Sequence, residues 1–183
     1  MEFTTEDVKR HSVQMPRAKK LYKPSKDRAA YELCKMKPFQ RGEIIERMVT
    51  EKIGEDYEHV VSSTQTSNTH PYDIDVTLDC GRKIRVEVKS ALYQISSNKY
   101  AYKQFKFQNI HVKHFDYIVF VAVTPNGLRA FWSESRRLWN NTTLGEENWQ
   151  GMENTVYNVR FKDDWSGPFK DPCWLRDMED FPF

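Results

Sequence analysis

Two short segments carry residue types that could perform chemistry together. Residues 70–76 read HPYDIDV and residues 85–89 read RVEVK, and the Asp-Cys-Gly-Arg run at 79–82 between them is typical of a tight turn. Both segments alternate apolar and polar residues, which predicts a β-hairpin. Folding that hairpin about residue 80 places Asp73 opposite Glu87, within one position.

The spacing of Glu87 and Lys89 decides where their side chains point. Residues two apart leave a strand on the same face, so Glu87 and Lys89 share a face while Val86 and Val88 point the other way. Two carboxylates near one another suit Mg²⁺, which prefers oxygen ligands and keeps several waters. An adjacent lysine can position or deprotonate one of those waters, and next to a metal cation we expect the pKa of Lys89 to be lowered.

This arrangement resembles the PD-(D/E)XK phosphodiesterase superfamily, which has the restriction-endonuclease-like fold. The signature is carried by Pro71-Tyr72-Asp73 and Glu87-Val88-Lys89, and the one departure is Tyr72, which separates the proline from the aspartate. The resemblance implies an α/β fold with a central mixed β-sheet flanked by helices. It also implies cleavage of DNA with Mg²⁺, for which Mn²⁺ can substitute. The alternative is an ordinary amphipathic hairpin in which Lys89 pairs with Glu87 or Asp73.

A fourth site residue is expected on a preceding helix. Residues 42–53 place their apolar side chains on one helical stripe, with Glu43 and Glu46 as neighbours on one face. In the superfamily, a glutamate on this helix often completes the metal site, and we favour Glu46 over Glu43. Asp73, Glu87 and Glu46 are therefore the expected metal ligands, and Asp75 is the alternative to Asp73.

The length of 183 residues fits one domain with a substantial core. We expect a basic N-terminal arm or short helices over residues 1–37, the nuclease core over 38–132, and a C-terminal extension packed on the same domain over 133–183. Further expected strands cover residues 59–63, 117–124, 128–132 and 155–161. Residues 134–139 predict a short helix, and residues 92–115 are interpreted as partly helical and partly loop.

Charge is unevenly distributed, although the net charge is only +2. Residues 9–28 are strongly basic, residues 88–115 contain no acid, and the segment from Asp163 onward is acidic. Clustered lysines and arginines are typical of a polyanion partner, here double-stranded DNA. The candidate DNA-binding residues are Ser90, Lys99, Lys103 and Lys106, together with Gln108, which the resemblance places near the active site.

Three widely spaced cysteines and the lack of a signal-peptide pattern predict an intracellular protein with unpaired thiols. The function expected first is that of a sequence-specific endonuclease, of restriction or homing type. Cutting both strands needs two sites, so a homodimer or a higher symmetric oligomer is expected. The alternatives are a structure-specific nuclease, such as a junction resolvase or repair nuclease, and a non-catalytic DNA-binding module.

Overall fold

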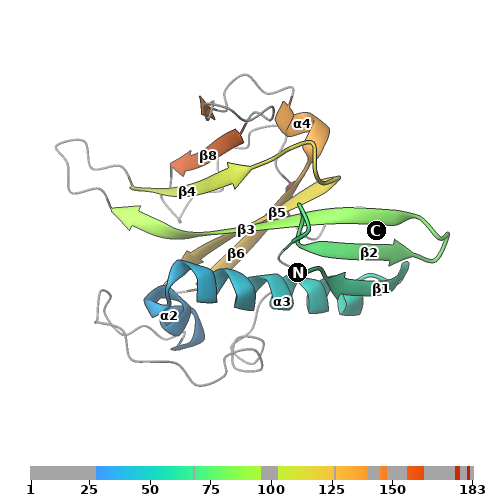
Figure 1. The fold of residues 1–183 in the computed structure, drawn as a ribbon. Helices are drawn as coiled ribbons and strands as arrows, with labels where there is room; N and C mark the ends of the chain where they lie inside the picture. Colours follow the sequence, from blue (N-terminus) through green and yellow to red (C-terminus); the bar gives the residue numbers. More distant parts are fainter. Residues whose placement is uncertain are drawn as a thin grey trace.

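The computed structural model describes residues 28–67, 69–95, 103–125, 127–139, 145–147, 156–162, 176–177 and 181. These residues form a mixed β-sheet flanked by helices (Figure 1), which confirms the α/β class expected from the sequence. The strands of this sheet are β1 (Val60–Gln65), β2 (Ile74–Leu78), β3 (Lys83–Ile95), β5 (Tyr117–Thr124), β6 (Gly127–Glu134) and β9 (Arg176–Asp177).

Strand β3 is the centre of this sheet. β2 pairs antiparallel with its first residues, in the register Ile74 to Val86, and the intervening turn uses Gly81 at a φ of 80°. That conformation favours glycine because it has no Cβ. β5 runs parallel to β3 from Val86 to Leu92, and it is buried along almost its whole length, as its unbroken apolar sequence predicts. The hairpin and the buried strand expected from the sequence are both present.

The far end of β3 leads into a second group of strands, formed by β4 (Lys103–Ile110), β8 (Val156–Lys162) and β7 (Gly145–Glu147). The expectation of helix and loop over residues 92–115 is therefore wrong for 92–95 and 103–110. Phe105 and Phe107 are fully buried while Gln108 is exposed. The strand is stabilised by pairing with β8, about fifty residues further along the chain.

Helices α2 (Arg28–Lys35) and α3 (Pro38–Asp56) lie together on one side of β3, and β4 and β8 lie on the other (Figure 1). α3 begins earlier than the expected residue 42, because Pro38 suits the first turn of a helix. It also continues past Gly54. α2 is the short helix expected near residues 26–35, and Leu33 and Cys34 from it belong to the same core as α3. Residues 1–27 lie outside the described part.

The sheet separates two apolar clusters. One lies between the sheet and helices α2 and α3, and the other includes Phe105, Phe107 and Phe120 together with Leu138 of α4 (Ser135–Trp139). Phe181, near the C-terminus, packs its ring against the first cluster, at 5.3 Å from Trp132 and 5.7 Å from Tyr57 between ring centroids. Within the described residues, none of the helices has the length and apolar character needed to cross a membrane.

Candidate functional site

A polar cleft of about 530 Å³ is lined by three of the four predicted catalytic residues, Glu46, Asp73 and Lys89, whereas the buried Glu87 does not line it. It is bounded by one face of α3, by the loop that precedes β2, by the middle of β3 and by the end of β4. The lining residues that matter for chemistry are Glu43, Glu46, Ser67, His70, Asp73, Lys89, Ser90 and Asn109. The cleft therefore combines carboxylates, one amine and several neutral hydrogen-bonding groups.

Asp73 is positioned by the backbone of the hairpin. Its amide donates to the carbonyl of Val86 at 3.1 Å, and its carboxylate Oδ2 accepts the amide of Val88 at 2.7 Å. The carboxylate thus binds the amide of Val88, two residues beyond Val86, the last residue of β3 that pairs with β2. Asp73 lies across from Glu87, as the hairpin pattern predicts. Burial raises the pKa of Asp73, although the Val88 amide and the Lys89 charge oppose that shift.

Glu87 is almost fully buried, with 5% of the residue exposed. Its Oε1 forms an ion pair with Nζ of Lys89, two residues along the same strand face. Burial raises the pKa of Glu87 to about 7, and the carboxylates of Asp73 and Glu46 add to this while Lys89 opposes it. An ion pair between Glu87 and Lys89 is also what an ordinary amphipathic hairpin would form. Here, however, the carboxylates of Asp73 and Glu46 interact with the same pair.

Glu46 reaches the same cluster from α3. Its Oε2 accepts a hydrogen bond from Nε2 of Gln65 in β1 at 3.1 Å, and burial together with the nearby Asp73 raises its pKa. Glu43 also lines the cleft, but it forms an ion pair with Arg47 at 2.7 Å, one turn along the helix surface. Glu46, and not Glu43, is thus the helix glutamate that interacts electrostatically with the hairpin residues.

Asp75 is in a different environment from Asp73. It is half-buried in β2, opposite Arg85, and bonds to the hydroxyl of Tyr72. It is not among the residues that line the cleft. The electrostatic interactions of Glu87 are with Asp73, Glu46 and Lys89, and Asp75 is not part of this group.

The carboxylates around Lys89 place its pKa above its ordinary value, whereas the lowering expected beside a metal cation concerns the metal-bound site. Burial alone would lower the pKa, but the carboxylates of Glu87, Asp73 and Glu46 together outweigh it. A lysine held among three carboxylates keeps its proton at neutral pH. Among these carboxylates alone, Lys89 is therefore a cation and a hydrogen-bond donor.

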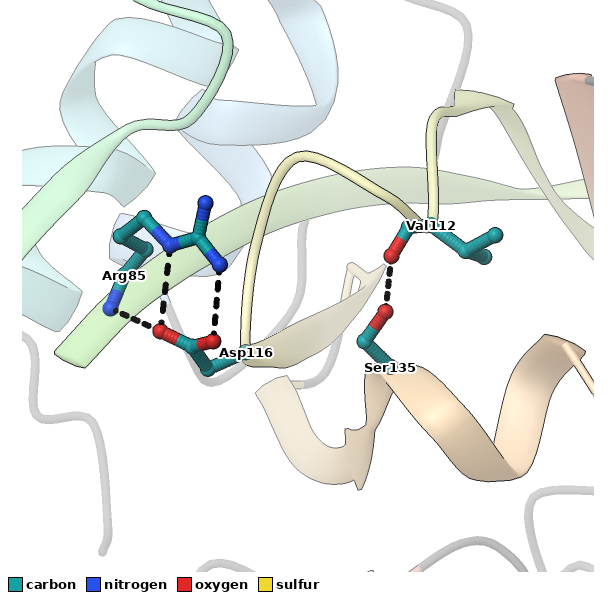
Figure 2. Close-up of polar contacts among 4 residues, drawn as sticks. All are labelled: Arg85, Val112, Asp116 and Ser135. Atoms are coloured by element: carbon teal, nitrogen blue, oxygen red, sulfur yellow. Dashed lines mark hydrogen bonds and ion pairs between the residues drawn. The ribbon is translucent and has the colours of Figure 1, made fainter. Parts of the chain in front are cut away.

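Polar contacts among Arg85, Asp116, Ser135 and Val112 connect the starts of β3 and β5, close to Glu87 and Lys89 in the sequence (Figure 2). This group of contacts is called the polar anchor. Asp116 accepts from the backbone amide of Arg85 at 2.9 Å and from its guanidinium at 3.2 and 2.9 Å. Beside it, Ser135 donates its hydroxyl to the carbonyl of Val112 and its amide to the carbonyl of Asp116. This anchor lies at the residues where the parallel pairing of β3 with β5 begins, two residues before Glu87.

The predicted DNA-binding residues are dispersed. Ser90 lines the cleft directly after Lys89. Gln108, which the resemblance places near the active site, is exposed on β4 and does not line the cleft. Lys106 is half-buried on the same strand. Lys103 begins β4, and Lys99 lies outside the described residues.

Two cleft residues, Asn109 and Phe39, and Gln65 beside Glu46 were not found from the sequence. Asn109 adopts a left-handed φ of 58° where the pairing of β4 with β8 shifts register, a conformation that asparagine tolerates better than most residues. Phe39 was missed because the predicted helix began three residues after it. Gln65 was missed because a side-chain bond between a strand and a helix leaves no pattern in the sequence.

The carboxylate cluster fits a divalent cation chemically. Its oxygen donors are those that Mg²⁺ and Mn²⁺ prefer. A cation would offset the cost of burial that raises all three pKa values, and the repulsion that raises the pKa of Glu46 and Glu87 further. Among the described residues, no three His, Cys, Asp or Glu side chains already converge as a complete metal site. Glu87 is held by Lys89, so a cation shared with Asp73 requires that ion pair to rearrange.

The raised pKa of Glu87 predicts that stability falls as pH rises. The folded state binds this proton up to about pH 7, whereas an exposed glutamate releases it near 4.5. The free energy of unfolding therefore decreases between these pH values, by at most about 3 kcal/mol, because each pKa unit corresponds to about 1.4 kcal/mol. Glu87→Gln should remove this dependence, so its advantage over the parent protein should grow from pH 4.5 to 7.

Urea denaturation in EDTA at several pH values measures this effect. Glu43→Gln is the matched control, since it removes an exposed glutamate at the edge of the same cleft. A constant difference between Glu87→Gln and the parent protein across this pH range would contradict the prediction.

Comparison with protein-family models and with curated proteins finds no match to this chain.

Proposed function

We propose that this chain is a metal-dependent nuclease that hydrolyses phosphodiester bonds in DNA. The observation that carries the proposal is the convergence of Asp73, Glu87 and Lys89 from one hairpin with Glu46 from α3. One buried carboxylate and two half-buried ones beside a protonated lysine are costly to fold. Such a cluster is typical of a functional site, and its donor chemistry suits a cation that binds a phosphate.

Asp73, Glu87 and Glu46 would hold one or two Mg²⁺ ions. The bound metal supplies charge neutralisation at the phosphoryl group and a water of lowered pKa. Asp73 is already oriented by the Val88 amide, and Gln65 orients Glu46. These hydrogen bonds fix two carboxylates on rigid elements, so the chain orders most of its ligands before substrate binds.

Lys89 would act on the substrate as a cation. Its ammonium group can donate to a non-bridging phosphate oxygen and to the attacking water, and so orient them. The start of α3 would add to the attraction of a phosphate. Lys37 provides no side-chain cap there, and Pro38 lines the cleft, so the positive end of the helix dipole lies beside the place where a phosphate would bind.

Sequence-specific cutting of double-stranded DNA, by a symmetric dimer with one site per strand, is the form proposed first from the sequence. The test is incubation of supercoiled plasmid and linear phage DNA with the purified protein, in Mg²⁺ and in EDTA. Discrete Mg²⁺-dependent bands support sequence-specific double-strand cleavage, and nicking or a smear supports a nuclease of another specificity. Binding without cleavage on any DNA substrate, branched ones included, would instead favour the non-catalytic module.

Mg²⁺ should also raise the melting temperature at pH 8, because a ligand that binds only the folded state stabilises it. This measurement does not depend on finding the right DNA. Glu87→Gln should abolish most of the increase, whereas Glu43→Gln should retain it. An equal increase in both variants would exclude Glu87 as a ligand.

A further inference from the structure

Phe39 is an unusual residue for a cleft of this kind. It is 72% exposed, yet it lines the same cleft as Asp73 and Lys89. Among the described residues, Val61 is the other exposed large apolar side chain, at 70%, and it lies on β1 outside the cleft lining. Single exposed apolar residues are common, so the position of Phe39, and not its exposure alone, calls for an explanation.

The helix explains that position. The other apolar side chains of α3, from Ile44 to Ile53, are buried against the sheet. Phe39 instead belongs to the stripe that continues through Glu43 to Glu46, at spacings of four and seven residues. The ring therefore lies about 10 Å along the helix from Glu46, at a rise of about 1.5 Å per residue.

The surroundings of Phe39 suit a single planar ring better than an apolar partner surface. Most of the lining is polar, with Ser67, His70 and Ser90 nearby, and the apolar remainder is Pro38 and Val88. Such a cleft offers no extended patch to a protein or a lipid. A flat aromatic side chain in a polar groove beside a phosphate-binding centre is the arrangement used to stack on nucleobases.

We infer that Phe39 stacks on an unpaired nucleobase of the substrate, so that the cleft prefers single-stranded or locally unpaired DNA. In an intact duplex, neighbouring bases cover both faces of each base, and a ring can reach only base edges. A distance of about 10 Å along α3 from Glu46 corresponds to a base within a few nucleotides of a phosphate held at the carboxylates. This inference rests on the proposed nuclease function, because it assigns the substrate class of the same cleft. It favours the structure-specific alternative over the cutting of intact duplex DNA that was proposed first from the sequence.

The test compares the binding of a single strand and of a fully paired duplex in EDTA, by fluorescence anisotropy. Phe39→Ala should weaken single-strand binding by about 5- to 150-fold, the range measured for stacking on one aromatic ring. Duplex binding should change by less than about twofold. Phe39→Trp should restore single-strand binding, and Phe39→Leu, which keeps an apolar side chain without a π face, should not.

Val61→Ala is the matched control, because it removes an equally exposed apolar side chain elsewhere. Single strands carrying 2-aminopurine at each of three positions on either side of the cut then locate the contact. The parent protein should quench one position, and Phe39→Ala should not. Equal losses on both DNA forms, no loss on either, or full binding by Phe39→Leu would overturn the inference.

Plasmid cleavage distinguishes this outcome from failure of the proposed function. If the parent protein cuts DNA but Phe39→Ala binds single strands normally, the nuclease stands and the stacking inference fails. If nothing is cut but the single-strand effect of Phe39 is observed, the cleft binds unpaired DNA without hydrolysing it.

Discussion

Replacing Lys89 by alanine is expected to reduce Mg²⁺-dependent DNA cleavage by about a hundred- to ten-thousand-fold, while DNA affinity falls only a few-fold. The range is that of a positioned group acting on the reacting atoms. Two effects act together. The variant loses the cation that orients water and phosphate, and the pKa of Glu87 rises further because its ion-pair partner is gone. At neutral pH Glu87 is then more fully protonated, so the site holds less carboxylate charge.

Single-turnover cleavage and equilibrium binding measured on the same DNA separate these contributions. Lys52→Ala is the matched control, since Lys52 pairs with acidic residues at the other end of α3 and does not line the cleft. Melting curves must accompany both variants, because removing one member of a buried ion pair destabilises a fold. Cleavage by Lys89→Ala at the rate of Lys52→Ala would exclude Lys89 from the reaction.

The hairpin was predictable because its signals are local. Alternating residues set the faces of β2 and β3, and the turn around Gly81 set the register, so Asp73 could be placed opposite Glu87 from the sequence. The buried strand β5 was predictable for a similar reason, because a continuous apolar run of this length is typical of a strand that is covered on both faces. Both features depend on residues within about fifteen positions of one another.

The rest of the site depends on contacts between distant segments. β4 is held by β8, whose partner residues are about fifty positions away, so its mixed sequence gave no reliable local signal. The choice between Glu43 and Glu46 depends on which side chain contacts β1. The hydrogen bond from Gln65 of β1 to Glu46 shows that it is Glu46. The direction of the Lys89 pKa depends on the balance between burial and three carboxylates, which spacing alone cannot supply.

Substitution of Asp73 is expected to give the second large loss of cleavage. Its carboxylate has two roles, as a proposed metal ligand and as the acceptor of the Val88 amide. Asp73→Asn removes the charge but keeps an oxygen that can accept the Val88 amide, so the fold should persist while cleavage falls at least about a hundredfold. Asp73→Ala removes the acceptor as well. It leaves a backbone donor of the buried Val88 without its partner, which costs about 1–3 kcal/mol.

We therefore expect both Asp73 variants to be inactive, with Asp73→Ala less stable than Asp73→Asn by that amount in urea denaturation. Asp75→Asn is the control, because Asp75 lies two residues further along the chain, in β2, and does not line the cleft; this variant should cleave at the parent rate. If Asp75→Asn were inactive and Asp73→Asn active, the motif aspartate would be Asp75 and the cleft would be the wrong site. Equal stability of the two Asp73 variants would instead mean that the Val88 bond orders the carboxylate without holding the hairpin. The two roles of Asp73 can thus fail independently, since one belongs to the chemistry and the other to the fold that presents it.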